Sequence, residues 1–168
     1  NQCDRVIRYV AHDYGNYYVR MGRHKIPVLT KKDGSVFFDK KYKYYYGRCD
    51  VLRAGSDLTI IAIGSVVAEA LKAVEMLKAK NISAEVVIAS SIKKFDKPLI
   101  NSIKKTRKVL TVEDHNTISG LGGQVAKLIL EKNIKVEKFT MLGVEDYQLS
   151  GLWSDLYKEV GIDSAGVV

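Results

Sequence analysis

Three adjacent side chains in this sequence can transfer protons. Glu113, Asp114 and His115 directly follow a short apolar run, Lys108–Val112. Carboxylates and histidine serve as general acids and bases, and histidine titrates near neutral pH. No nucleophile stands at a recognisable spacing beside them, however. The triplet is therefore either a proton-transfer group or a structural or subunit-contact element, and we favour the second interpretation.

A glycine-rich stretch follows the triplet. Gly120, Gly122 and Gly123 open an amphipathic helix whose apolar positions are Val125, Leu128 and Ile129. Backbone amides at such a helix start can hold a phosphate. The dinucleotide-binding fingerprint, however, places its glycines after the first strand and an acidic residue roughly 20 residues further on. We therefore favour close helix–strand packing over a nicotinamide or flavin site.

Two arginines nearer the start are candidates for anion binding. Arg20 and Arg23 lie on either side of Gly22, which lets the backbone approach a ligand closely. The planar guanidinium matches the geometry of a phosphate. The alternative is that both are ordinary exposed charges.

Metal ligands are not grouped in the sequence. His12 and His24 have no ligand partner at metal spacing, and Cys3 and Cys49 form no CxxC motif. We expect no metal site and a reduced, cytoplasmic protein. A single disulfide between the two cysteines is the less favoured alternative.

The elements that position these residues alternate between strand and helix from Asp57 onward. This alternation predicts an α/β domain, a three-layer sandwich around a mostly parallel sheet of about five strands. Val51-Leu52 is expected to add one antiparallel edge strand. The predicted strands are 58–63, 84–89, 108–112 and 136–142, and the predicted helices are 66–80, 98–105, the glycine-led helix and 150–160, with Ser65 as a cap of the first helix.

The first third of the chain differs in composition. Residues 1–55 carry 12 Lys/Arg against five Asp/Glu, and eight of the ten tyrosines fall within the first 46 residues. A helix over 2–13 and a short strand over Tyr17–Val19 cannot form a core alone, so we expect the tail of a preceding domain. A basic, tyrosine-rich face can bind nucleic acid, but a solvated or interface face is the favoured interpretation.

No apolar run approaches the roughly 20 residues of a membrane helix, and no secretory signal is visible. Since the chain begins at Asn1 without methionine, we expect it to be a fragment or processed product of a longer protein.

Five segments in order resemble the C-terminal part of transketolase and its thiamine-diphosphate-dependent relatives. They are YVRMGRHKIPV (18–28), LRAGSDLTIIAIGSVVAEALKA (52–73), SIKKFDKPLI (91–100), VEDHNTISGLGGQVA (112–126) and LGVEDYQLSG (142–151). The VEDH-to-GLGG segment is most similar to the short, archaeal-type split transketolases. The family usually has proline and leucine where this chain has Lys94 and Phe95.

The resemblance implies a domain plan. Residues 1–30 would be the tail of a pyrimidine-binding domain, 31–50 a linker and 51–168 a transketolase C-terminal domain. The family transfers a two-carbon ketol unit between phosphorylated sugars in the pentose phosphate pathway. Its thiamine diphosphate and Mg²⁺ would bind outside this chain, which we expect to be inactive alone and to support a homodimer.

The resemblance also implies one site residue. The second arginine of the tail motif, here Arg23, would hold the substrate phosphate.

The alternative identities of the chain are the C-terminal domain of a 1-deoxyxylulose-5-phosphate synthase or of a 2-oxo-acid dehydrogenase E1 β-subunit. A binding or assembly module without catalytic activity is the rival of another class.

Overall fold

The computed structural model describes residues 2–168, and its centre is a five-stranded sheet. The strands lie in the order β1-β3-β2-β4-β5, and only the edge pair β1–β3 is antiparallel. Both the mostly parallel sheet and the antiparallel edge confirm the predicted fold class. The strands are β1 (Cys49–Arg53), β2 (Leu58–Ile63), β3 (Ala84–Ala89), β4 (Lys108–Glu113) and β5 (Lys138–Leu142).

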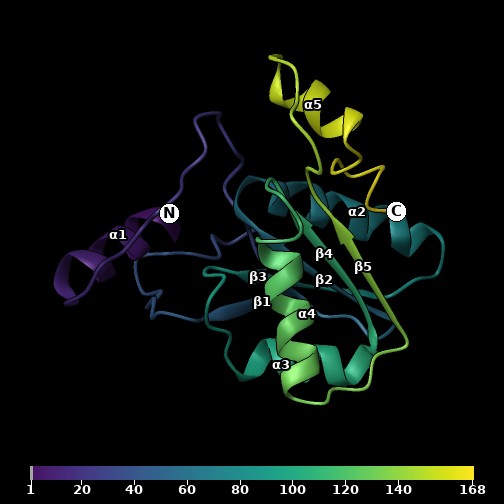
Figure 1. Cartoon of the computed structure of the whole chain (residues 1–168), viewed down its shortest axis with the longest axis horizontal. Coiled ribbons are helices and arrows are strands. Elements are labelled where there is room, and N and C mark those ends of the chain that lie inside the picture. Colours follow the sequence, from purple (N-terminus) through teal and green to yellow (C-terminus); the bar gives the residue numbers. More distant parts are fainter. Residues whose placement is uncertain (1) are drawn as a thin grey trace.

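Helices cover both faces of the sheet, which gives the three layers (Figure 1). α2 and α5 contribute to the core on one face, whereas α3 and α4 pack against the other. α1 stands apart at the side of the molecule and buries none of its residues. The helices are α1 (Gln2–His12), α2 (Val67–Ala79, after the 3-10 turn Gly64–Val66), α3 (Lys97–Thr106), α4 (Leu121–Glu131) and α5 (Trp153–Glu159).

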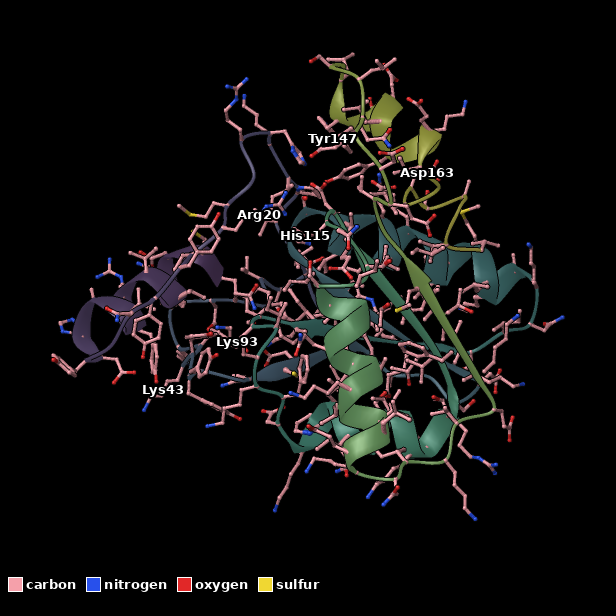
Figure 2. All side chains as sticks on the ribbon, viewed as in Figure 1. Arg20, Lys43, Lys93, His115, Tyr147 and Asp163 are labelled. Carbon is pink, nitrogen blue, oxygen red and sulfur yellow. The ribbon has the colours of Figure 1, made fainter. Side chains whose placement is uncertain are left out.

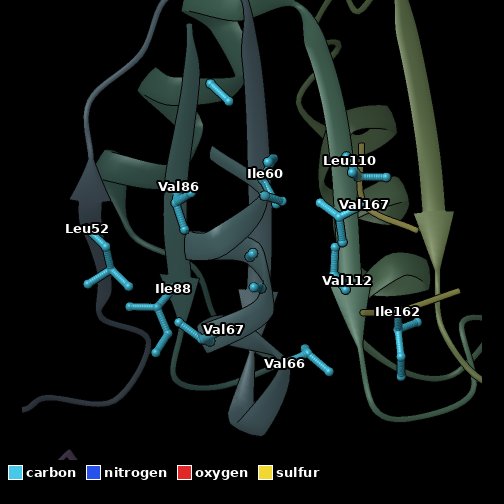
Figure 3. Packing of buried hydrophobic residues seen from close by; sticks show 14 of the residues in the cluster. Leu52, Ile60, Val66, Val67, Val86, Ile88, Leu110, Val112, Ile162 and Val167 are labelled. Atoms are coloured by element: carbon cyan, nitrogen blue, oxygen red, sulfur yellow. The ribbon is translucent and has the colours of Figure 1, made fainter. Parts of the chain in front are cut away.

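The two cores follow from the twofold alternation of side chains along each strand. In β2, Ile60 packs with the α2 side and Ile61 with the α3–α4 side, both fully buried. β3 and β4 alternate in the same way, so each contributes apolar side chains to both faces, as expected of a covered parallel sheet, although Glu85 and Thr111 are buried polar exceptions. Figure 3 shows the α2-side core, where Ile162 and Val167 from the end of the chain close over Leu110 and Val112.

The early segment differs from its prediction. Tyr17–Val19 forms no strand: the backbone there pairs with no neighbour, and Tyr18 is 90% exposed. A strand needs a partner for its backbone groups, and none lies beside this segment in the described residues. Residues 31–50, by contrast, contact the sheet domain, because Phe38 is buried in the α2-side core.

Within residues 2–168, no helix has both the length and the apolar character that crossing a membrane requires.

Candidate functional site

Glu113, Asp114 and His115 lie at the carboxyl end of β4, and Ser65 follows the carboxyl end of β2. Strands β2, β4 and β5 run parallel, so their last residues and the loops after them share one edge of the sheet. α5 lies beyond this edge (Figure 1). In α/β folds ligands commonly bind at this edge.

Glu113 ends β4 and uses its carboxylate inside the fold. Oε2 accepts the amide of Leu121 at 2.6 Å and Oε1 that of Gly122 at 2.7 Å. The side chain is 1% exposed. Burial raises the pKa of Glu113, and the two amide hydrogen bonds oppose that rise. Since a carboxylate of the chain already occupies the first amides of α4, the phosphate-loop interpretation of the glycines is wrong.

The glycines instead permit close packing, as favoured from the sequence. A Cβ on Gly120 would lie 1.8 Å from Glu113 Oε2, and one on Gly123 would lie 2.1 Å from the carbonyl oxygen of Ile118. Both distances are far below van der Waals contact. The GLGG sequence therefore lets the loop wrap around the buried carboxylate.

Asp114 belongs to a second polar cluster, formed with Ser65 and Tyr157. The Tyr157 hydroxyl donates to Asp114 Oδ2 at 2.9 Å, and Ser65 Oγ lies 2.6 Å from the Tyr157 oxygen. Burial is the main cause that raises the pKa of Tyr157, so this phenol stays protonated and acts as a donor. The prediction that Ser65 caps α2 is wrong, because α2 has no side-chain cap and the Ser65 hydroxyl bonds across the fold.

His115 is exposed, and its side chain makes only a local contact. Its Nδ1 lies 3.2 Å from the carbonyl oxygen of Asn116, and its own carbonyl accepts the amide of Val144 after β5. Among the described residues, no nucleophile lies within hydrogen-bond distance of the imidazole. The triplet thus divides its roles: Glu113 holds α4, Asp114 joins three segments, and His115 faces solvent.

The segment Tyr18–Val28, here called the arm, crosses this edge of the sheet. Arg20 Nη1 donates to the carbonyl oxygen of Asp114 at 2.8 Å. Figure 2 shows Arg20 and His115 near each other, in the half of the molecule that carries α5. His24 stacks on Trp153 of α5, with ring centroids 4.8 Å apart and planes at 14°. Sequence reasoning missed this contact, because it weighed His24 only as a metal ligand.

Arg23 lies between these two contacts. It is exposed, and within residues 2–168 its guanidinium takes part in no hydrogen bond or ion pair that meets ordinary distance limits. The geometry leaves it available to an anion outside the chain.

Metal-binding side chains are scattered. In the part of the chain that the structure describes, no three His, Cys, Asp or Glu side chains form a group able to hold a metal ion. Because Glu113 also blocks the amides at the start of α4, these residues do not fit a magnesium–diphosphate group. Cys3 and Cys49 are both free, so the disulfide alternative is wrong.

The basic first third forms a shallow hollow between α1 and residues 42–44. It holds about 460 Å³ and is lined by both arginines of α1, His12 and Lys43. Several tyrosines here pack on one another: Tyr9 and Tyr44 meet edge to face at 5.3 Å. Such pairing suits an interface or solvated face better than a row of open rings for stacking bases.

Fold and site together define an α/β domain. The polar side chains at the carboxyl edge of its sheet bind helices of the same domain and the arm that precedes it in the chain. Comparison with known proteins then identifies the family. The family described as "Transketolase, C-terminal domain" matches residues 47–167, and the chain belongs to this family. Its members are parts of thiamine-diphosphate-dependent enzymes, in which other domains bind the cofactor.

Several relatives match nearly the whole chain. A putative transketolase C-terminal section from Methanocaldococcus jannaschii is 38% identical over 96% of this chain and 49% of its own length. One subunit of an apulose-4-phosphate transketolase from Actinobacillus succinogenes is 32% identical over 100% of this chain and 52% of its own. A solved split-gene transketolase, described as an inactive β4 tetramer, superposes with a TM-score of 0.86 at 32% identity, covering 99% of this chain and 52% of that one.

The chain thus spans about half the length of these relatives. Shorter stretches, 60% and 55% of the chain, also match a 1-deoxy-D-xylulose-5-phosphate synthase of Desulforudis audaxviator and a mitochondrial pyruvate dehydrogenase E1 β-subunit of Dictyostelium discoideum. The family therefore includes more than one reaction.

Proposed function

We propose that this chain is the C-terminal section of a transketolase that moves a two-carbon ketol unit between phosphorylated sugars in the cytoplasm, in the pentose phosphate pathway. The observation that carries the proposal is the match of 96% of the chain to a putative transketolase C-terminal section. The match continues through the arm, beyond the residues of the family domain itself.

In this proposal residues 1–30 end a pyrimidine-binding domain, 31–50 link it to the last domain, and 51–168 form that domain. The remaining domains, on the same polypeptide or on a second subunit, supply thiamine diphosphate and Mg²⁺. The last domain supports a homodimer. Two relatives, one named as a single subunit of a transketolase and the other as a split-gene transketolase, support an enzyme built from separate parts.

Arg23 then binds the phosphate of the sugar. Its guanidinium presents parallel N–H donors that match phosphate oxygens, and no group of the described chain competes for them. Arg20 is less available for that role, because one of its five N–H donors already bonds to the Asp114 carbonyl. The structure therefore favours Arg23 over Arg20 as the phosphate ligand.

The test uses the complete enzyme. Hydrogen bonds to a charged group contribute about 1.5–3 kcal/mol, so Arg23→Ala should raise KM for phosphorylated ketoses roughly 10- to 100-fold. KM for unphosphorylated ketoses should hardly change. Lys25→Ala is the matched control, since Lys25 is an exposed cation on the same arm. Equal effects of Arg23→Ala on both substrate types would remove the phosphate role.

The competing reactions are separated by product analysis. A transketolase consumes xylulose phosphate and ribose phosphate together, whereas the synthase and dehydrogenase alternatives consume pyruvate. Consumption of pyruvate alone would assign the chain to one of those alternatives. If the assembled protein used neither, the binding or assembly module would be the remaining proposal.

A further inference from the structure

The arm is fixed at two points that bracket Arg23. On one side Arg20 bonds to the Asp114 carbonyl, and on the other His24 stacks on Trp153. Only two residues separate Arg20 from Arg23, and His24 is its immediate neighbour. The direction of the Arg23 side chain therefore depends on both contacts.

The His24 contact is a stacking contact. Its ring lies nearly parallel to Trp153 and meets Tyr157 edge to face, with centroids 6.0 Å apart. Its Nε2 is buried and has no hydrogen-bond partner among the described residues. Ring packing, rather than a hydrogen bond, thus holds this point of the arm.

The surface that receives the ring is held in place by further contacts. Tyr157 is 4% exposed, hydrogen-bonds to Asp114 and Ser65, and meets Trp153 edge to face at 5.4 Å. Asp114 takes part twice, because its carboxylate receives Tyr157 and its carbonyl receives Arg20. One cluster at the carboxyl edge therefore supports both fixed points of the arm.

We propose that Trp153 of α5 is a positioning residue for substrate phosphate: by stacking on His24 it orients Arg23 toward the sugar phosphate. The inference rests on the proposed function of Arg23. It assigns the last domain a share in substrate recognition, beyond assembly.

The test compares variants of Trp153 in the complete enzyme. From the strength of aromatic pairs, Trp153→Ala should raise KM for phosphorylated ketoses about three- to tenfold. kcat, and KM for unphosphorylated ketoses, should stay near wild type. Trp153→Phe keeps a ring for His24 and should recover most of the effect. Ser154→Ala, an exposed change in the same turn of α5, should have none.

The same contact is tested from the arm, where a change leaves the core intact. His24→Ala should reproduce the effect of Trp153→Ala, whereas His24→Phe should retain phosphate selectivity. On an Arg23→Ala background, Trp153→Ala should add no further loss for phosphorylated substrates, because the group that it orients is gone.

The outcomes separate the two proposals. If Arg23→Ala is selective for phosphorylated substrates but neither Trp153→Ala nor His24→Ala is, the positioning role is wrong and the proposed function stands. If Arg23→Ala affects both substrate types equally, the proposed phosphate role of Arg23 falls and this inference with it. An effect of Trp153→Ala that remains in full on the Arg23→Ala background would also overturn the positioning role.

Discussion

Replacing Glu113 by glutamine tests the claim that this carboxylate holds α4 to the sheet. Glutamine has nearly the same shape but offers one acceptor oxygen, so one of the two amides, of Leu121 or Gly122, would face an NH₂ group. The change therefore isolates a single hydrogen bond in a site that is 1% exposed.

The expected loss of stability follows from the backbone amide that is left without an acceptor. A buried donor left without a partner costs about 1–3 kcal/mol. Loss of the negative charge at the start of α4 removes a favourable interaction of about 0.3–1 kcal/mol. The neutral amide is cheaper to bury, which offsets that second contribution. We therefore expect Glu113→Gln to lower the free energy of unfolding by about 1–3 kcal/mol at pH 8.

Urea unfolding of the assembled protein measures this change. Glu131→Gln is the control: it lies at the end of the same helix, exposed, with only a 3.7 Å contact to Lys127, and should cost less than about 0.5 kcal/mol. A loss for Glu113→Gln no larger than for Glu131→Gln would refute the reasoning. It would mean that the helix start is satisfied by water or by other groups.

Three further outcomes follow from the same geometry. Burial raises the pKa of Glu113 above its unfolded value of about 4.5, so the folded state keeps the proton to higher pH. The stability of the wild type should therefore fall as pH rises from 4.5 through the folded-state pKa. Glu113→Gln should lack this contribution in unfolding curves measured across pH 4–8. Gly123→Ala should destabilise the folded protein by about 1–3 kcal/mol, because its Cβ would meet a backbone oxygen. Gly151→Ala, whose Cβ would have its nearest neighbour at 3.5 Å, should change the stability little. Equal melting temperatures of the two variants would contradict this. Burial raises the pKa of the Cys49 thiol to about 12, whereas Cys3 is exposed. Iodoacetamide at pH 8 should therefore modify Cys3 first and Cys49 only after unfolding, which mass spectrometry would show. Equal rates of modification in the native state would argue against a closed core.

The sheet could be predicted from sequence because its signals are local and strong. β2 and β3 begin and end where the apolar runs predicted, since strands buried on both faces are apolar at most positions and are bounded by polar turns. The start of the last helix was predicted less accurately. It begins at Trp153 rather than Ser150, because Leu152 keeps an extended backbone with ψ of 138°.

The contacts of the site were mostly beyond sequence reasoning, because they join distant segments. Glu113 reaches amides eight and nine residues away across a loop whose path no periodicity encodes. Ser65 had the residue type of a helix cap, yet its hydroxyl bonds to Tyr157, 92 residues later. His24 and Trp153 likewise meet only in the folded chain. Local propensity is a weak prior wherever a tertiary partner is available.

The stacking of His24 on Trp153 also sets an order of events during synthesis. The two residues are about 130 positions apart, so the arm leaves the ribosome long before its aromatic partner exists. At roughly 5–20 residues per second, about 6 to 26 seconds separate the synthesis of His24 from that of Trp153. Its Arg20 contact must wait for Asp114 as well. The two fixed points of the arm therefore form only after Asp114 and Trp153 have been made, long after the arm itself.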